Sequence, residues 1–379
     1  MKIALIHDWF YHVAGAEKVF SNILQLYPDA DIYCLFEKVS SKEKQLLFNN
    51  KKIHTTFLQY IPFIEKMYKI LLPIFPYAIS TLDVSKYDLI ISSSHAVAKG
   101  VKTNKNQIHI CYCHTPMRYV WDLKNQYLKS YNFLLKYAMN AILNKMKKWD
   151  YKISQNVDYY IANSHFIAKR IKKNYHRESI IIEPSIDISK FEIADTKEDY
   201  YITTSRFVYY KRLDIIIETF QKITDKNLVI IGSGDEFNAF KNRTKNNANI
   251  KLLGSIEEVL LIETLKKAKA FIFAAEEDFG IAPIEAQACG IPVIGFGKGG
   301  LLETIIGKFS NEEITDNKQT GIFFKEQTVD SIIESILFFE KNIHKFDPEI
   351  IRENAIRFDK KIFESKFKAA VEEIIMNHK

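Results

Sequence analysis

Short apolar runs alternate with helical segments along almost the whole 379-residue chain, and this alternation restarts once. Apolar runs of about four to eight residues, each followed by a loop and a helical pattern, are typical of a parallel sheet covered by helices. The first set of expected strands is Lys2–His7, Asp31–Phe36, Tyr87–Ser93, Gln107–Cys113, Tyr159–Asn163 and Ser179–Glu183. The second set is Tyr200–Ser205, Asn227–Ile231, Ile250–Leu253, Ala270–Ala275, Pro292–Phe296 and Gly321–Phe324. Two such sets predict an α/β protein with two doubly wound, Rossmann-like domains.

The break between the two sets lies near Pro184–Glu198, where the apolar patterning weakens. We therefore expect an N-terminal domain over residues 1–186 and a C-terminal domain over residues 187–358. Residues 359–379 form a terminal segment, because Lys360–Met376 carries apolar residues at helical spacing. Other expected helices are Ala16–Leu26, Lys211–Ile223, Glu257–Lys269 and Ala282–Cys289.

The composition is that of a globular protein, with 47% hydrophobic and 26% charged residues. The net charge of +7 favours anionic partners: nucleic acid, anionic lipid or phosphorylated small molecules. The four cysteines are too few for a disulfide scaffold, which indicates a reducing compartment. No stretch of about 18 apolar residues occurs, and the first apolar run is broken too early for a signal peptide.

Cys111, Cys113 and His114 lie close together in the sequence and have two interpretations. They could contribute to a metal site, but no second Cys/His cluster completes a zinc ligand set. Alternatively, residues two apart on a strand share a face, where small buried thiols are common. The second interpretation is favoured, and we expect no metal.

Two stretches of the N-terminal domain are unusually rich in large apolar side chains. Phe57–Ile79 is dense in Phe, Tyr, Ile, Leu and Pro, and Leu134–Lys152 mixes apolar residues with five lysines. A basic amphipathic segment suits an anionic membrane surface. The alternative is a helix that packs on its own domain and leaves its lysines in water.

The sharpest feature of the sequence runs from Glu276 to Gly290 and contains Glu277 and Glu285 on either side of Phe279-Gly280. Glu277 follows an expected strand, and Glu285 falls in the first turns of the next helix, which Pro283 helps to start. Ligands bind at this edge of doubly wound sheets, and free helix N–H groups there favour phosphate. Carboxylates repel phosphate, so two carboxylates beside a phosphate site are expected to bind another part of the ligand. Sugar hydroxyls, which donate hydrogen bonds to carboxylates, are the natural candidates.

Arg206 and Lys211 follow the expected strand Tyr200–Ser205 and lie five residues apart. Together they can clamp a diphosphate, the guanidinium in a bidentate manner and the ammonium as a point charge. The alternative, two solvated cations at a helix start, is disfavoured by the helix dipole. Gly232-Ser-Gly234 also follows a strand but lacks the third glycine of a dinucleotide fingerprint, so with Gly254 it is expected to line a nucleoside pocket.

The Glu277–Glu285 spacing with Phe279-Gly280 between the two resembles the signature of retaining glycosyltransferases of family 4 (glycosyl transferases group 1), which have the GT-B fold. Other pieces resemble this family in the same order over nearly the whole chain: Gly15, Asn163-Ser164, Pro184–Asp187, Arg206 with Lys211, Gly297–Gly300 with Glu303, and Thr320-Gly321. The first loop departs from the pattern, because the single Gly15 stands where many members have two glycines.

The resemblance implies a GT-B protein whose two domains face a cleft and whose last helix returns to the N-terminal domain. It implies that Arg206 and Lys211 hold the donor diphosphate, and that Glu285 holds the ribose and Glu277 the sugar. The catalytic set is then Glu277, His114, Arg206 and Lys211, and the donor-binding set is Gly15, Arg206, Lys211, Gly232, Gly254, Phe279, Gly280, Ile281, Glu285, Gly299 and Gly300. His114 would face the sugar; the alternative is an ordinary hydrogen-bonded loop histidine. No metal or other cofactor is implied, since two cations and helix dipoles can neutralise a leaving diphosphate.

The stretches Tyr87–His95 and Cys113–Trp121 resemble a mannosyltransferase-like subgroup that builds bacterial surface polysaccharides, including lipopolysaccharide, often from GDP-mannose. The resemblance therefore implies hexosyl transfer with retention to a glycan or polyprenyl-linked oligosaccharide. The protein would be cytoplasmic and peripheral on the inner face of the cell membrane. A nucleotide-sugar epimerase of GT-B fold is the alternative, and a non-enzymatic nucleic-acid-binding protein is less favoured because it leaves the paired glutamates unexplained.

Overall fold

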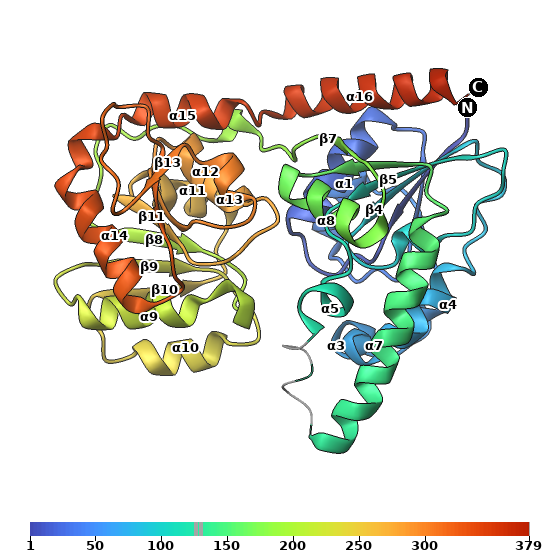
Figure 1. Cartoon of the computed structure of the whole chain (residues 1–379), viewed down its shortest axis with the longest axis horizontal. Coiled ribbons are helices and arrows are strands. Elements are labelled where there is room, and N and C mark those ends of the chain that lie inside the picture. Colours follow the sequence, from blue (N-terminus) through green and yellow to red (C-terminus); the bar gives the residue numbers. More distant parts are fainter. Residues whose placement is uncertain (125–127, 129–131, 379) are drawn as a thin grey trace. The chain divides into compact units, whose positions relative to one another are not determined.

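The computed structural model contains two parallel β-sheets (Figure 1). It describes residues 1–124, 128 and 132–378, without the side chains of Lys69 and Leu134. Each sheet has seven strands among the described residues. The expected α/β class with two doubly wound sheets is therefore confirmed. Residues 1–184 and 363–379 group into one unit and residues 185–362 into a second.

The first sheet has the strand order β3-β2-β1-β4-β5-β6-β7. Its strands are β1 (Ile3–His7), β2 (Asp31–Cys34), β3 (Ile53–Thr55), β4 (Leu89–Ser94), β5 (Ile108–Cys113), β6 (Tyr159–Ala162) and β7 (Ile180–Ile181). The α-helices of this unit are α1 (Gly15–Leu26), α2 (Ser41–Phe48), α3 (Ile64–Leu71), α4 (Phe75–Ile79), α5 (Arg118–Trp121), α7 (Phe133–Ser154), α8 (His165–Tyr175) and α16 (Lys360–Asn377). Short 3-10 turns are η1 (Phe57–Tyr60), η2 (Leu72–Ile74) and η3 (Ala98–Gly100).

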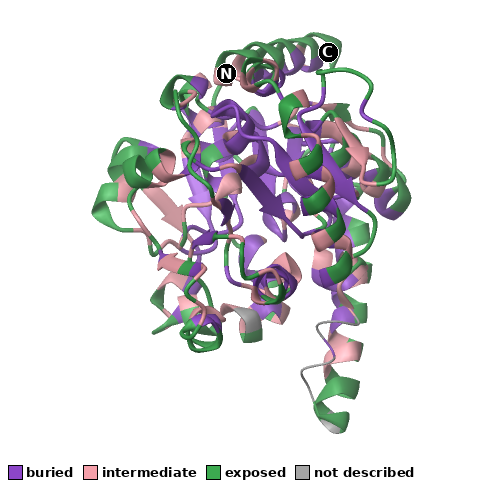
Figure 2. Cartoon of the chain, turned by 90° about the vertical axis from the view of Figure 1, so that its left-hand side faces the viewer, coloured by how far each residue is buried: buried purple, intermediate pink, exposed green. Residues whose placement is uncertain are grey.

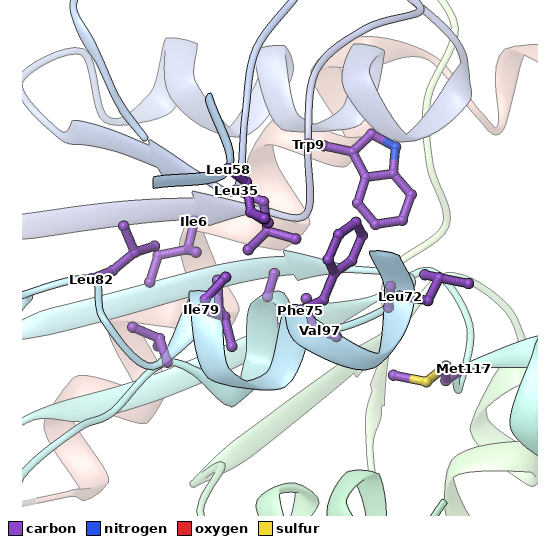
Figure 3. Close-up of a cluster of buried hydrophobic side chains, with 14 of the residues drawn as sticks. Ile6, Trp9, Leu35, Leu58, Leu72, Phe75, Ile79, Leu82, Val97 and Met117 are labelled. Carbon is purple, nitrogen blue, oxygen red and sulfur yellow. The ribbon is translucent and has the colours of Figure 1, made fainter. Parts of the chain in front are cut away.

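Alternate residues of β1 point to opposite faces of the sheet, and a separate core forms on each face. Ala4 and Ile6 join a cluster with η2 and α4, in which Trp9 and Phe75 lie close together (Figure 3). Leu5 joins the opposite cluster, which includes side chains of α1 and of the terminal helix α16. The strands are accordingly buried and the outer helix faces exposed (Figure 2).

A buried ion pair attaches the long helix α7 to the core of the first unit. The Lys99 ammonium in η3 lies 2.6 Å from the Asp150 carboxylate in α7, and both side chains are almost fully buried. Trp121 and Tyr175 donate to the other carboxylate oxygen, at 2.8 and 2.7 Å. Burial alone lowers the pKa of Lys99, but the Asp150 carboxylate outweighs burial and raises it overall.

The second sheet has the strand order β10-β9-β8-β11-β12-β14-β13. Its strands are β8 (Tyr201–Thr204), β9 (Leu228–Ile231), β10 (Ile250–Gly254), β11 (Ala270–Phe273), β12 (Val293–Phe296), β13 (Gly307–Phe309) and β14 (Gly321–Phe324). The α-helices are α9 (Leu213–Lys222), α10 (Phe237–Thr244), α11 (Glu258–Lys266), α12 (Ile281–Ala288), α13 (Leu301–Thr304), α14 (Val329–Lys341) and α15 (Pro348–Ile356). The 3-10 turns are η4 (Ile188–Lys190), η5 (Tyr209–Lys211) and η6 (Ile343–Lys345).

The helix predicted over Lys211–Ile223 begins later than expected. Lys211 ends the 3-10 turn η5, Arg212 has a φ of +54°, and α9 begins only at Leu213. A non-glycine residue in the left-handed region breaks helical continuity. Lys211 therefore lies in the loop after β8, and the helix-start argument about its charge does not apply.

Candidate active site

The strand order of the second sheet reverses between β8 and β11, which are parallel neighbours. In doubly wound sheets, the loops that leave the carboxyl ends of two such strands diverge and form a ligand-binding crevice. The β8 loop carries Arg206 and Lys211, and the β11 loop carries Glu277. The topology therefore brings the predicted diphosphate-binding cations and the predicted sugar-binding carboxylate to one edge of one sheet.

Lys211 and Glu277 form an ion pair across these two loops. The Lys211 Nζ lies 2.5 Å from Glu277 Oε1, and each side chain keeps 17% of its surface exposed. The same ammonium lies 5.6 Å from the centre of the Phe273 ring, at the end of β11. Arg206 is more exposed, on the same loop as Lys211. The two loops thus present positive and negative groups that a solute can still reach.

The glycines after β12 hold the Glu277 loop in place. The N–H of Gly300 donates to the Glu277 carbonyl at 2.8 Å. A Cβ on Gly299, whose φ is +72°, would lie 2.4 Å from that same carbonyl oxygen. Only glycine permits so close an approach at such a φ. The Gly300 N–H thus helps to position the Glu277 loop, and contact of Gly300 with the donor stays a prediction.

Helix α12 starts at Ile281, directly after Gly280, whose φ is +101°. Glu285 is the fifth residue of α12 and is half-buried, like Ile281. The Phe279 side chain is instead buried in the core, with its ring centre 5.4 Å from that of Phe358. Phe279 can therefore take part in donor binding only through its backbone.

Gly232 and Gly254 bring the ends of β8, β9 and β10 together. The N–H of Gly232 donates to the Gly254 carbonyl at 2.9 Å. A Cβ on Gly232 would lie only 1.8 Å from the carbonyl oxygen of Ser205. A side chain at Gly232 would thus force the β8 loop away from β9. That the two glycines line a nucleoside pocket stays a prediction.

His114, in the first unit, belongs to a buried hydrogen-bonded group at the carboxyl ends of β1, β4 and β5. Its Nε2 lies 2.7 Å from Ser93 Oγ, which in turn lies 3.1 Å from His7 Nδ1. The other nitrogen of His7 lies 3.5 Å from Glu17 in α1, close to Gly15 at the start of that helix. Burial and the nearby His7 and His95 lower the pKa of His114 to about 3, so its ring is neutral.

Asp8 is a residue whose role the sequence did not reveal. Its two carboxylate oxygens accept four successive backbone N–H groups, from His95, Ala96, Val97 and Ala98, at 2.5 to 3.0 Å. Burial opposes the charged form, but His95, His7 and these N–H groups together lower the Asp8 pKa. The signal for such a role in the sequence was a carboxylate directly after a buried strand. Asp8 fixes the loop after β4 against β1, next to the His114 group.

The buried histidines predict a loss of stability at mildly acid pH. The pKa of His109, like that of His114, is lowered by burial to about 3, whereas an unfolded histidine titrates near ~6.5. Between pH 7.5 and 5.5 the unfolded chain therefore gains protons that the folded protein does not. Each of the two histidines should lower the free energy of unfolding by about 1 kcal/mol over this range.

Urea unfolding at pH 7.5 and 5.5 measures this loss. His109→Gln keeps a polar partner for Ser92, which lies 2.8 Å from His109 Nε2, and should remove about 1 kcal/mol of the difference between the two pH values. The carboxylates Asp8 and Glu17 titrate below this window and leave the comparison unaffected. An equal pH dependence in His109→Gln would contradict the assignment.

Two further findings concern metal binding and membrane spanning. Within residues 1–124, 128 and 132–378, no group of three or more His, Cys, Asp or Glu side chains is arranged to bind a metal ion. In the same part of the chain, no helix is both long and apolar enough to cross a bilayer.

Comparison with known proteins assigns each half of the chain to a family. Residues 13–190 match the family described as Glycosyltransferase Family 4, and residues 185–358 match Glycosyl transferases group 1. A GDP-mannose-dependent monoacylated alpha-(1-6)-phosphatidylinositol monomannoside mannosyltransferase of Corynebacterium glutamicum is 28% identical over 49% of this chain, a match that spans about half (54%) of that relative. An uncharacterized glycosyltransferase of Methanocaldococcus jannaschii is 25% identical over 82% of this chain and 83% of its own length.

The fold is shared with solved structures. The Anabaena protein HepE, solved in complex with UDP and glucose, superimposes with a TM-score of 0.69 at 15% identity, over 98% of this chain and 99% of its own. The consecutive family matches cover both sheets, and the architecture is that of these neighbours. The chain therefore belongs to the glycosyltransferases of GT-B fold.

Proposed function

We propose that this protein transfers a hexosyl group from a nucleotide-sugar to an acceptor with retention of the anomeric configuration. The observation that supports this most directly is the Lys211–Glu277 pair at the β8/β11 crevice, where a cation and a carboxylate meet at a ligand-binding edge. A diphosphate that enters would compete with Glu277 for the Lys211 ammonium. The released carboxylate would then be available to sugar hydroxyls.

In this proposal, Lys211 and Arg206 stabilise the negative charge that develops on the departing diphosphate. Glu285 accepts hydrogen bonds from the ribose, and Glu277 accepts them from the sugar. His114, held neutral by burial, can donate or accept a hydrogen bond at the sugar without adding charge. The acceptor oxygen attacks the anomeric carbon from the face that the diphosphate leaves, and the acceptor proton passes to the diphosphate. The two cations provide the charge neutralisation, so the proposed reaction includes no metal step.

A GDP-linked mannose is the donor that we propose, from the C. glutamicum relative and the sequence of Tyr87–Trp121. HepE is described with UDP and glucose, so the base and the sugar need a direct test. A thermal-shift panel of GDP-mannose, UDP-glucose and ADP-glucose provides it. A true donor at about a hundred times its Kd stabilises by about 2.7 kcal/mol and should raise Tm by about 5 °C.

The site variant to compare in this panel is Glu285→Gln, which keeps the size of the side chain but weakens its proposed hydrogen bonds to ribose. Its shift with the selected donor should shrink, while its Tm without ligand stays near that of the parent. If no nucleotide-sugar raises Tm, the donor site is wrongly assigned. Proton NMR of the product then tests retention, because the coupling of the anomeric proton reports its configuration.

The proposed acceptor is a glycan or polyprenyl-linked oligosaccharide of surface polysaccharide synthesis, reached at the inner face of the cell membrane. A GT-B epimerase would instead release free nucleotide and sugar with no acceptor present. Incubating donor with protein alone distinguishes the two: a transferase should show slow release that an acceptor accelerates.

A further inference from the structure

Exposed aromatic side chains concentrate on two segments of the first unit. Among the described residues, six of the eight exposed Phe and Tyr side chains belong to these segments: Phe57, Tyr60, Phe63, Tyr77, Phe133 and Tyr137, with only Tyr151 and Tyr209 elsewhere. Met67, Ile70, Ile74 and Leu135 are also exposed there. We call the exposed residues of Phe57–Tyr77 and Phe133–Tyr137 the aromatic surface. Exposed apolar residues that gather on one part of a protein mark a surface that contacts another phase or molecule.

The first turns of α7 carry the most exposed part of this surface. Phe133 is 84% and Tyr137 78% exposed, and every described side chain from Asn132 to Ala138 is exposed. Figure 1 shows this end of α7 extending beyond the sheet of its own unit, and Figure 2 shows its end as exposed. The aromatic end is not needed to hold α7, which is attached further along at Met146 and Asp150.

The two segments form one substructure, because their inward faces pack in the same core. Leu72 and Phe75 from the first segment share a buried cluster with Leu143 and Met146 of α7. Phe57 and Tyr77 also lie side by side, with ring centres 5.9 Å apart. Burial of the inward faces leaves both outward faces available together.

The charge around the aromatic surface is mainly positive: its two segments contain Lys66, Lys69 and Lys136 against one carboxylate, Glu65 on α3. The sequence contains six lysines and no Asp or Glu between Asp122 and Asp150. Lys66, on α3, and Lys136, on α7, are exposed among the aromatic residues. Lysines beside Phe, Tyr and aliphatic side chains are the combination that enters the headgroup layer, with apolar groups in the acyl boundary and ammonium groups at lipid phosphates.

We propose that the aromatic surface docks this protein on an anionic phospholipid bilayer. Helix α3 and the first turns of α7 would enter the headgroup layer. An anionic bilayer explains both the aromatic residues and the lysines, whereas a second copy of this chain would bring like charges together. The inference extends the proposed membrane-linked acceptor but does not depend on it, since it concerns binding and not transfer.

Flotation with vesicles tests the proposal directly on the full chain. The parent protein should float with vesicles of equal phosphatidylglycerol and phosphatidylcholine and should not float with phosphatidylcholine alone. Phe133→Ser/Tyr137→Ser should lower the apparent partition coefficient by at least about tenfold. The matched control is Val259→Ser/Leu260→Ser, which removes two exposed apolar side chains of α11 in the other unit and should leave flotation unchanged.

A second pair of variants tests the charge. Lys66→Glu/Lys136→Glu should weaken flotation and its dependence on salt, whereas Lys241→Glu/Lys245→Glu makes the same charge change at exposed sites of the second unit and should alter flotation much less. Light scattering of each variant reports self-association. Equal flotation of test and control variants would overturn the proposal, as would a dimer of the parent that dissociates in Phe133→Ser/Tyr137→Ser.

The failure of this inference is separable from failure of the proposed function. None of the altered residues belongs to the Lys211–Glu277 site, so the thermal shift with nucleotide-sugar should be the same in every variant. Lost flotation with a normal donor shift supports the docking surface. Normal flotation with no donor shift instead contradicts the proposed transfer.

Discussion

Lys211→Ala should lower turnover by about a hundredfold to a thousandfold while the protein remains folded. Removing one preorganised positive group from a developing negative charge typically has an effect of this size. The side chain lies in the loop after β8 and is partly exposed, so its truncation leaves no cavity in the core. Initial rates of nucleotide release, measured with the donor selected by thermal shift and an acceptor glycan, provide the test.

Lys222→Ala is the matched control, because Lys222 ends α9, eleven residues after Lys211, and pairs with an exposed carboxylate, Asp330. It should keep nearly full turnover. Glu277→Ala should resemble Lys211→Ala, with kcat falling in both, since the two groups serve the same site. Near-normal transfer by Lys211→Ala would remove the basis of the site assignment.

Lys99→Met should lower the free energy of unfolding by about 3–5 kcal/mol, the largest stability effect that we expect. It leaves the Asp150 carboxylate buried without its counter-charge, and a buried charge that loses its partner is strongly destabilising. Trp121 and Tyr175 still donate to that carboxylate, so the loss should come from the missing charge more than from missing hydrogen bonds. Urea unfolding at neutral pH measures the effect.

Two further variants test whether the loss of stability comes from the unpaired charge and from its burial. Lys99→Met/Asp150→Asn removes both charges and should regain much of the stability. Lys86→Met breaks an exposed pair with Asp31 at 3.6 Å and should change the free energy of unfolding by less than about 1 kcal/mol. A loss in Lys99→Met no larger than in Lys86→Met would show that the buried pair contributes little.

The sequence predicted the parallel sheets because buried strands of such sheets are continuous apolar runs. Leu228–Ile231 and Ala270–Phe273 are of this kind. The strands Ile53–Thr55 and Gly307–Phe309 were not predicted, since they are three residues long, lie at sheet edges and are only half-buried. Weak burial leaves too little apolar patterning to detect.

The candidate site was predictable where one loop carries its own signal, as with Glu277 and Glu285. Pairing between loops was not, because it depends on the strand order that places β8 beside β11. The group around His114 was missed for the same reason: Ser93 and His7 are far apart in sequence but end adjacent strands. The left-handed Arg212 was also unpredictable, because no glycine marks that position.

The packing of α16 determines how this chain can be divided and in which order its parts can fold. Phe363, Phe367 and Val371 are buried against the first sheet, whereas residues 185–362 form the second unit as one continuous stretch. A fragment that ends at Pro184 would expose the apolar face that these side chains cover. The second unit, in contrast, is one continuous stretch, so we expect it to fold when it is expressed by itself. During synthesis it can fold as soon as its own residues have emerged, while the first unit, although made earlier, must wait for α16 to complete its core.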